Sequence, residues 1–340
     1  MIYAVQQPAQ FVLRPLEIKH IYDFAIRLYR ARFAPMFLSM ALAQLPVSLV
    51  WISITIALVR FQQDLMTAQG KGDLSTSDWM LSQADKGIWV AGLLLFAMAY
   101  TLLVWPLGAL TCSCLASRTL LGEEVSLAEA FRFAKSRYWP TQVALATFGL
   151  PMVVLALIML IFFLALTAGA PGGAVGGAVS AILLIFAGMA VTLLMWFRFF
   201  PALMGIVQCA EEPEGRDMFA QGIWYMKRSY ALTQGYFLRL LGLSLLLNFA
   251  VGLVQRGVSE SVQLVYMIIH AVNSGSASAE KLFEQVAVTQ SDPIYFAIVI
   301  GAASIVSLLF PGLMVCFEAL LYYDLRCRKE GFDLLHLLGR

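Results

Sequence analysis

Polar side chains inside long apolar segments are the first candidates for chemistry in this chain. Arg198, Glu318 and Asn248 lie in segments that are otherwise apolar, and polar groups in such surroundings often mark ion or substrate paths. Arg198 precedes Pro201 by three residues, and Glu318 follows Pro311 by seven. If the two prolines lie at one depth, the charges are about 15 Å apart along a helix axis. Direct pairing of Arg198 with Glu318 would require one helix to be shifted along its axis relative to the other. We favour the alternative, in which each charged side chain extends along its helix to the lipid headgroups.

The sequence carries no signature of an enzyme or of a metal site. It has no glycine-rich phosphate loop, no HExxH and no GxSxG pattern, each of which would place a defined set of reactive groups together. The three histidines are far apart, and Cys112-Ser113-Cys114 does not have a zinc spacing. We therefore expect no enzymatic activity, no cofactor, no metal and no nucleic-acid partner.

The densest pattern of mixed charge lies at 321–334, where the last apolar segment ends. Asp324 and Arg328 are four residues apart, which is a favourable spacing on a helix, and Gly331 is suited to closing that helix. A solvated basic flank would account for the arginines but not for the acids or the paired tyrosines. We interpret the segment as a docking surface for the chain's own amphipathic helices or for a partner protein, formed by Tyr322, Tyr323, Asp324, Arg326, Arg328 and Glu330.

The candidate residues above lie in a chain that has the composition of an integral membrane protein. Of the 340 residues, 60% are hydrophobic and 13% are charged, whereas soluble domains have about 25% charged residues. The apolar residues form blocks long enough for helices that cross a hydrocarbon core of about 30 Å. The blocks predict six spans with approximate bounds, at 35–59, 88–117, 141–167, 176–208, 237–255 and 294–322.

The loops predict the orientation of the chain. With the N-terminus inside, most of the 23 lysines and arginines fall on the cytoplasmic side, as the positive-inside rule requires. We therefore expect a multi-pass membrane protein with both termini in the cytoplasm. The five cysteines then lie at or beyond the cytoplasmic ends of spans, where reducing conditions disfavour disulfides, and we interpret them as packing residues.

In the outer loop at 257–293, the apolar stretch Val262 to Val272 predicts a short interfacial helix.

The apolar segments contain an internal repeat. Pro106, Pro201 and Pro311 each follow an aromatic residue near the end of a predicted span, and each is expected to kink its helix by removing a backbone hydrogen bond. Residues 25–35 also align with 130–140 without a gap. The sequence thus predicts one all-α membrane domain over 1–340, a pseudo-threefold bundle of three parallel units, each with an amphipathic elbow helix and two spans. The units cover approximately 14–118, 119–209 and 210–325, and a C-terminal motif follows at 326–340.

The elbow helices are amphipathic and basic. In the first, an apolar face is predicted by the helical spacing of Ile18, Ile21, Tyr22, Ala25, Leu28 and Tyr29. In the second, Ser126 and Glu129 form a capping-box pattern, with Leu127, Ala130, Phe131 and Ala134 as the apolar stripe. In the third, Phe219, Ile223, Met226 and Tyr230 form the stripe. Helices of this kind lie in the headgroup plane with basic residues toward anionic lipid; here these residues are Arg27, Arg30, Arg32, Arg132, Lys135, Arg137, Lys227 and Arg228.

Three segments carry a resemblance to a known family: Arg14-Pro15-Leu16-Glu17-Ile18, then 227–235, and Tyr322-Tyr323-Asp324-Leu325-Arg326 with its continuation to Leu334. In these segments the chain resembles stand-alone bacterial multi-pass proteins related to the membrane domain of glycerophosphodiester phosphodiesterases. Cys327 is the main departure from the pattern. The catalytic barrel of the phosphodiesterases is absent, so the resemblance implies no hydrolase. It implies gene clusters with a MoxR-type ATPase and other membrane proteins, and hence an assembly role.

Two functions follow as expectations. The first is a non-enzymatic inner-membrane subunit or scaffold that assembles with membrane or cytoplasmic proteins, through its elbows and its C-terminal motif. The second is a lipid-binding, transport or channel protein that uses a cavity between the three repeats. Membrane lipids are ligands in both, and a homo-oligomer remains open.

Overall fold

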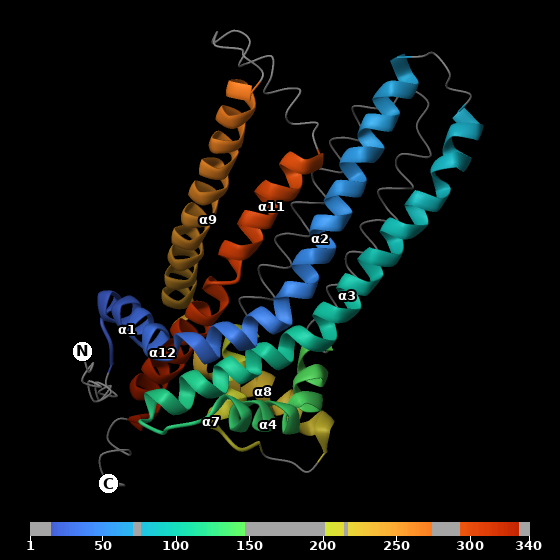
Figure 1. Cartoon of the computed structure of the whole chain (residues 1–340). Helices are drawn as coiled ribbons and strands as arrows, with labels where there is room; N and C mark the ends of the chain where they lie inside the picture. The colour runs from blue at the N-terminus through green and yellow to red at the C-terminus, as the bar shows by residue number, and fades with distance from the viewer. Residues whose placement is uncertain (1–14, 71–75, 147–200, 214–216, 274–292, 333–340) are drawn as a thin grey trace, which may run out of the picture. The chain divides into compact units, whose positions relative to one another are not determined.

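The computed structural model describes residues 15–70, 76–146, 201–213, 217–273 and 293–332, and this part of the chain is helical, with no strands (Figure 1). Residues 138–146 are also helical. The labelled helices are α1 (Ile18–Ala31), α2 (Phe33–Gly70), α3 (Thr76–Leu120), α4 (Leu127–Ser136), α7 (Pro201–Ala210), α8 (Met218–Thr233), α9 (Phe237–Asn273), α11 (Pro293–Ser307) and α12 (Phe310–Glu330).

Four segments within these helices are long and apolar enough to cross a membrane: Phe33–Ala57, Ile88–Leu120, Phe237–Ile269 and Ile298–Glu330. Most of their side chains are not buried by the protein itself, as expected for helices whose outer faces meet lipid tails. This confirms that the described part of the chain is all-helical and has four candidate membrane spans. The predicted spans at 141–167 and 176–208 fall almost entirely outside the described residues.

The prediction of a short interfacial helix in the outer loop after the fifth span is wrong. The segment Val262 to Val272 is not a separate interfacial helix, because α9 runs without interruption from Phe237 to Asn273. The helices α2 and α3 also extend far into the predicted outer loop at 61–87. Polar residues in these extensions can still propagate a helix, because each added residue gains one backbone hydrogen bond.

The described contacts divide the chain into two compact units. Unit 1 contains Met1–Arg32, Leu110–Ser244 and Val315–Arg340, and unit 2 contains Phe33–Ala109 and Leu245–Met314. The division falls inside α3, α9 and α12. Unit 1 therefore holds the short helices together with the ends of three long ones.

The first two elbow helices form as their sequences predict. In α1 the side chains of Ile21, Ala25, Leu28 and Tyr29 are buried, whereas Ile18 is exposed. At α4 the Ser126 hydroxyl accepts a hydrogen bond from the Glu129 amide, and the Glu129 carboxylate accepts one from the Ser126 amide. These backbone and side-chain hydrogen bonds lower the pKa of Glu129. Such a cap stabilises a helix start by about 1 kcal/mol.

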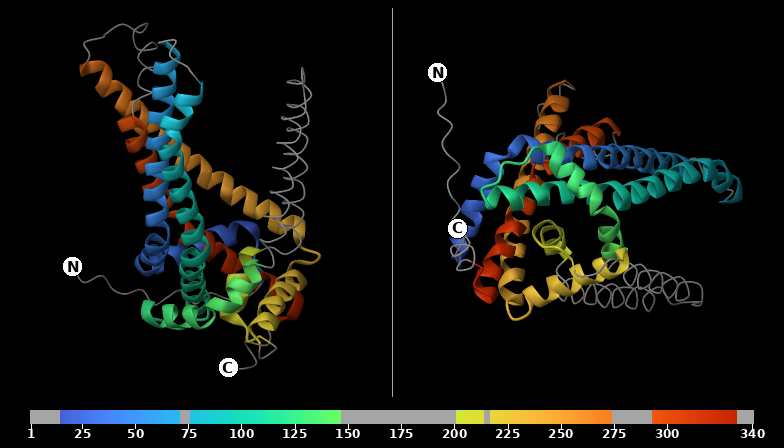
Figure 2. Two further views of the ribbon diagram at one scale, coloured as in Figure 1. Left: turned by 90° about the vertical axis from the view of Figure 1, so that its right-hand side faces the viewer. Right: turned by 90° about the horizontal axis from the view of Figure 1, so that it is seen from below.

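The apolar stripes of the other elbows differ from the prediction. Phe131 of α4 is exposed although Ala130 and Ala134 are buried. In α8 the residues Phe219 and Ile223 are exposed, whereas Met226 is buried as predicted. The rest of the buried face is formed by Gly222, Tyr225, Ser229, Leu232 and Thr233. The helix contacts α7, where Met226 packs with Met204. Both views of Figure 2 show the yellow α8 beside the red α12.

Unit 2 is assembled by close helix packing. The helices α2 and α11 lie side by side, and Gln44 of α2 donates a hydrogen bond to Ser307 of α11 at 3.5 Å. Gly108 of α3 faces α2 so closely that a Cβ at this position would lie 2.7 Å from the Ala43 Cβ. The Ser39 hydroxyl donates to the Gly108 carbonyl in the same contact.

Pro106 and Pro311 have different positions in their helices. Pro106 lies inside α3, whereas the residues before Pro201 lie outside the described part of the chain. Pro311 is the second residue of α12, and the chain turns at 308–309 between α11 and α12. Proline is well accommodated at a helix start, where its missing N–H costs nothing. The last apolar segment is therefore two helices instead of one kinked helix.

Candidate functional site

The acid and base side chains of α12 form a cluster within unit 1. We call it the α12 cluster and define it by the side chains of Glu211, Arg228, Arg239, Tyr322, Asp324, Arg326, Arg328 and Glu330. It has two halves, one around Asp324 and one around Glu211. In both halves, residues far apart in the sequence meet α12.

Asp324 holds the segment that leads into α1. Its carboxylate, almost fully buried, accepts a hydrogen bond of 2.7 Å from the Leu16 amide. The same carboxylate pairs with Arg328, one turn later on α12, and with Arg239 on α9, at 3.0 Å and 3.3 Å. The Leu16 carbonyl in turn accepts hydrogen bonds from Arg239 and Arg328 at 2.7 Å and 2.9 Å. Both backbone groups of Leu16 are thus satisfied by side chains from the last third of the chain.

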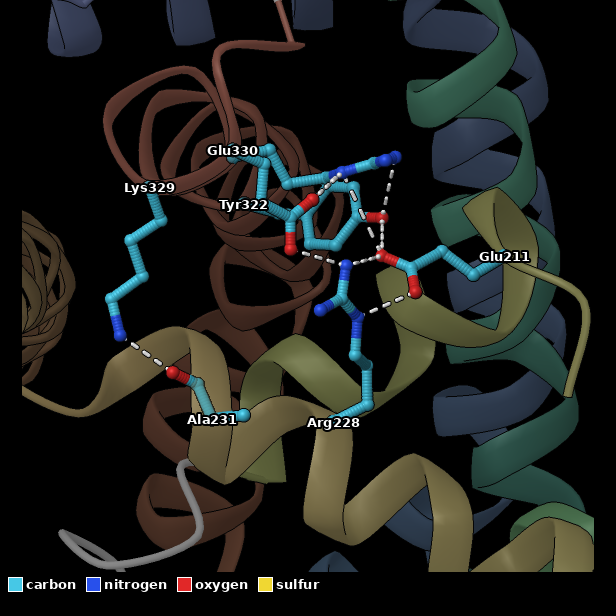
Figure 3. A network of polar contacts seen from close by, with 7 residues as sticks. Glu211, Arg228, Ala231, Tyr322, Lys329 and Glu330 are labelled. Carbon is cyan, nitrogen blue, oxygen red and sulfur yellow. Dashed lines mark hydrogen bonds and ion pairs between the residues drawn. The ribbon is translucent and has the colours of Figure 1, made fainter. Parts of the chain in front are cut away.

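Glu211, just after the end of α7, is the centre of the other half (Figure 3). The Arg228 guanidinium of α8 donates two hydrogen bonds to its carboxylate, at 2.6 Å and 3.0 Å. The Tyr322 hydroxyl donates a third at 2.6 Å. Arg228 also pairs with Glu330 at 2.6 Å. A two-pronged contact between a guanidinium and a carboxylate fixes orientation as well as distance.

Arg326 and Glu330 close this half of the cluster. The Arg326 Nε donates to Glu330 at 2.9 Å, and its Nη1 donates to the Tyr322 hydroxyl at 3.3 Å. The same guanidinium lies 4.0 Å from the centre of the Phe332 ring, a cation–π geometry. Every charged side chain of this half therefore has a partner of opposite charge.

Two further contacts join α12 to neighbouring helices. Tyr323 shares a hydrogen bond of 2.7 Å with Ser117 near the end of α3. Lys329 donates to the Ala231 carbonyl at the end of α8. Together with the Tyr322–Glu211 bond, these contacts connect α12 to α3, to the end of α7 and to α8.

The electrostatics favour the charged forms of the cluster. Burial lowers the pKa of Arg228, but hydrogen bonds and ion pairs with Glu211 and Glu330 outweigh it and raise the pKa above its ordinary value. Nearby, burial raises the pKa of the Tyr225 hydroxyl, which accepts a hydrogen bond of 3.1 Å from Arg137. The four arginines of the cluster pair with its three carboxylates, so most of its charge is compensated within the chain and the cluster can position helices.

The structure thus places all six residues of the predicted docking surface on α12, with Tyr322, Tyr323 and Asp324 buried and Arg326, Arg328 and Glu330 half-buried. The contacts described for these side chains are with other parts of the same chain. The i,i+4 pair of Asp324 and Arg328 is confirmed. Gly331 has a φ of 60° and follows the last residue of α12, so its predicted role in closing the helix is confirmed as well.

The intramembrane polar residues do not come together in the described part of the chain. Arg198 lies outside the described residues. Glu318 is half-buried on α12, and no hydrogen bond or ion pair is described for its carboxylate. Asn248 lies on an exposed face of α9. Among the described residues, no group of three or more histidine, cysteine, aspartate or glutamate side chains could hold a metal ion.

The basic elbow residues divide into two groups. Arg137 and Arg228 are engaged within unit 1, by Tyr225 and by the α12 cluster respectively, and Arg32 is half-buried. The others have exposed side chains: Arg27, Arg30, Arg132, Lys135 and Lys227. Of these, Arg27 pairs with Asp23 at 2.8 Å. Only part of the predicted basic surface is therefore available to headgroups.

Glu211, Arg239 and Leu16 were not identified from the sequence as members of a site. Arg239 carried a usable signal, because it stands inside the apolar run that begins at Phe237 and a charge there needs a partner. Glu211 lies in a short acidic stretch beyond an apolar segment, which is ordinary for a loop. Leu16 takes part through its backbone, for which the sequence has no signal.

Comparison with known protein families, curated proteins and solved structures finds no match to this chain. The function must therefore be argued from the geometry of the α12 cluster and the surfaces around it.

Proposed function

We propose that this protein is a non-enzymatic scaffold subunit of a bacterial inner-membrane complex, with six spans arranged as three parallel repeats and both termini in the cytoplasm. The observation that carries the proposal is the α12 cluster. Its charges bind Leu16, Glu211, Arg228 and Arg239, which belong to the first and the third of the proposed repeats. A protein that only needed to cross the membrane would not require such a network at one end of its helices.

The three-unit arrangement is supported by the contacts among the second helices of the proposed repeats. Cys209 of α7 donates to the Leu110 carbonyl of α3 at 3.7 Å, and Tyr323 of α12 contacts Ser117 of α3. Tyr322 of α12 reaches Glu211 after α7. The contacting residues lie after Pro106, Pro201 and Pro311, so the segments that follow the repeated prolines meet one another, as a pseudo-threefold bundle requires.

In this proposal the C-terminal motif acts on partners indirectly. Its side chains fix the elbow helices, and the exposed faces of those helices provide the contact surfaces. Lys135 and Lys227 would face anionic headgroups, while a cytoplasmic or membrane protein binds the platform that the cluster holds rigid. A MoxR-type ATPase is the partner class that the family resemblance implies.

A lipid-handling or transport function would use a space between the repeats. At the level of the α12 cluster, however, α12 contacts α3 directly and reaches the residue that follows α7. This packing favours the scaffold over a channel at that end of the helices.

The test is extraction of the tagged full-length protein from its native membrane without detergent, followed by quantitative mass spectrometry of what co-purifies. We expect a partner in fixed stoichiometry with the wild type, and about tenfold less of it with Glu330→Gln, which removes the charge that pairs with Arg228 and Arg326. The matched control is Glu260→Gln, which removes an equivalent charge from an exposed pair on α9 and should keep the partner.

Two results would contradict the proposal. One is a wild-type protein that co-purifies with lipid alone. The other is a cluster variant that keeps every partner although its thermal unfolding shows that the cluster has been weakened.

A further inference from the structure

Two cysteines of unit 1 form a pair that the α12 cluster does not use. Cys209 near the end of α7 lies against the part of α3 that contains Cys114, and each thiol influences the pKa of the other. Both stand eight residues after the repeated proline, at Pro106 and Pro201 respectively. The pairing thus joins equivalent positions of two proposed repeats.

The backbones around this pair approach each other closely. A Cβ added to Gly205, one turn before Cys209, would lie 2.9 Å from the Ser113 hydroxyl, so glycine is what allows the two helices to meet here. The Cys209 sulfur also lies 3.7 Å from the Leu110 carbonyl, one turn before Cys114. A disulfide requires Cα atoms within about 7 Å and Cβ atoms that face each other. Helices in contact through a glycine and a serine next to the two cysteines meet this requirement more readily than helices separated by large side chains.

The surroundings of the pair also suit thiol chemistry. Arg118 follows Cys114 by one helical turn, and its positive charge favours the thiolate of both cysteines, although burial has the larger effect on Cys209 and raises its pKa. A thiolate is the nucleophile in cysteine oxidation, and a neighbouring arginine stabilises it. Cys114 is buried, but Cys209 is only half-buried, which gives a small oxidant a way to the pair.

We propose that Cys114 and Cys209 are a redox-sensitive dithiol, which a peroxide converts into an intramolecular disulfide that covalently joins α3 to α7. One thiolate attacks a peroxide oxygen, the O–O bond breaks, and a sulfenic acid and one water form. The second thiol displaces the sulfenic oxygen as a second water, and the S–S bond forms. Two thiols are oxidised and one hydrogen peroxide is reduced, with both thiol protons ending in water.

The disulfide would change how α3 and α7 are held together in unit 1. In the reduced protein α3 and α7 are held by packing and hydrogen bonds, whereas the disulfide would close a loop of about 95 residues and restrict the unfolded chain. A reducing compartment keeps such a pair as thiols most of the time, and disulfides that form there are typically transient and redox-sensing. The inference does not depend on the proposed scaffold function, since it concerns two side chains and the helices that carry them.

The experiment uses the full-length protein in lipid nanodiscs. The purified, reduced protein is treated with hydrogen peroxide, free thiols are then blocked, and peptides are mapped by mass spectrometry. We expect a loss of two hydrogen atoms, with a linked peptide pair that contains Cys114 and Cys209 and reverts with dithiothreitol. The oxidised protein should also unfold several degrees higher than the reduced one.

Serine variants provide the controls. Cys114→Ser and Cys209→Ser should each abolish the linked peptide and the shift in unfolding temperature. Cys112→Ser removes a buried cysteine of α3 two residues away and should leave both unchanged. The proposal fails if wild-type protein gives only sulfinic or sulfonic acids at the pair, or if the linked peptide contains Cys112, Cys316 or Cys327 instead. The wild-type map alone decides this, so the test stands even if a variant does not fold.

Discussion

Unit 1 and unit 2 are held together by different kinds of contact. In unit 1 the acids Glu211 and Asp324 each bind groups from two other segments, which for Asp324 are the Arg239 side chain and the Leu16 amide. In unit 2 the described contacts between helices are uncharged, such as Gln44 with Ser307 and the close approach of Gly108 to Ala43. The exposed surface of unit 2 carries large apolar side chains that include Trp89 and Ile305.

We expect this difference to follow from what surrounds each unit in a membrane. Helices in a hydrocarbon core gain nothing from burying apolar side chains against one another, so small residues and shape hold them together. Where helices leave the core, charges can be kept, and pairing them specifies which segments meet. The comparison teaches that this chain separates two tasks: unit 2 is suited to lipid contact, and unit 1 selects one arrangement of helix ends.

The largest effect is expected at Asp324, because its carboxylate is the most buried charge of the α12 cluster. Asp324→Asn leaves Arg239 and Arg328 without their counter-charge and weakens the bond to the Leu16 amide. Loss of one partner of a buried ion pair costs about 3–5 kcal/mol, so the midpoint of thermal unfolding in nanodiscs should fall strongly. Asp23→Asn, which breaks the exposed pair with Arg27, is the control and should cost less than about 1 kcal/mol. Equal effects of the two variants would show that the cluster does not hold unit 1 together.

A smaller loss is expected at Glu211, which is less buried and keeps part of its hydrogen bonding as an amide. Glu211→Gln should lower the free energy of unfolding by about 2 kcal/mol, because Arg228 loses a charged partner. Glu212→Gln is the neighbouring control, since Glu212 is exposed. Protection of α8 amides against hydrogen exchange should drop in the first variant and not in the second. Unchanged protection of α8 would argue that Glu211 does not fix this helix.

The stability of unit 2 should depend on side-chain volume and not on charge. Gly108→Val places a branched side chain against Ala43 and the Ser39 carbonyl, and overpacking of this kind costs about 1–3 kcal/mol. Gly92→Val is the control on the same helix, because nothing lies within 4 Å of a Cβ at that position. The measurement is again the thermal midpoint. A Gly108 variant as stable as the Gly92 variant would break the distinction between the units.

The smallest effect is expected at Gln44. Its amide nitrogen forms one long hydrogen bond with Ser307, while its Oε1 is buried without a partner. Hydrogen bonds between helices in membranes contribute about 0.6 kcal/mol on average, so Gln44→Leu should change stability by less than about 1 kcal/mol in either direction. A loss as large as that of Asp324→Asn would mean that unit 2 also relies on polar contacts.

Local features of the fold could be predicted from the sequence because their causes lie within a few residues. The capping box of Ser126 and Glu129, the end of α12 at Gly331 and the buried face of α1 follow from propensity and spacing. The exposed Phe131 and the uninterrupted α9 could not be predicted, because each depends on what lies beside the helix. The periodic pattern gives the faces of a helix but not which face its neighbour covers.

The candidate site likewise combines features that are predictable from the sequence with features that depend on contacts between distant segments. The sequence by itself determined that the chain is helical and apolar enough to cross a membrane, and that Asp324 and Arg328 pair along one helix, because composition and i,i+4 spacing decide these points. Only the tertiary structure decided that Leu16 and Arg239 complete the Asp324 half, that Glu211 joins Arg228 to Tyr322, and that Cys114 meets Cys209. These partners are separated by many residues, and nothing in a charge or a thiol specifies its partner until helix packing brings the two together.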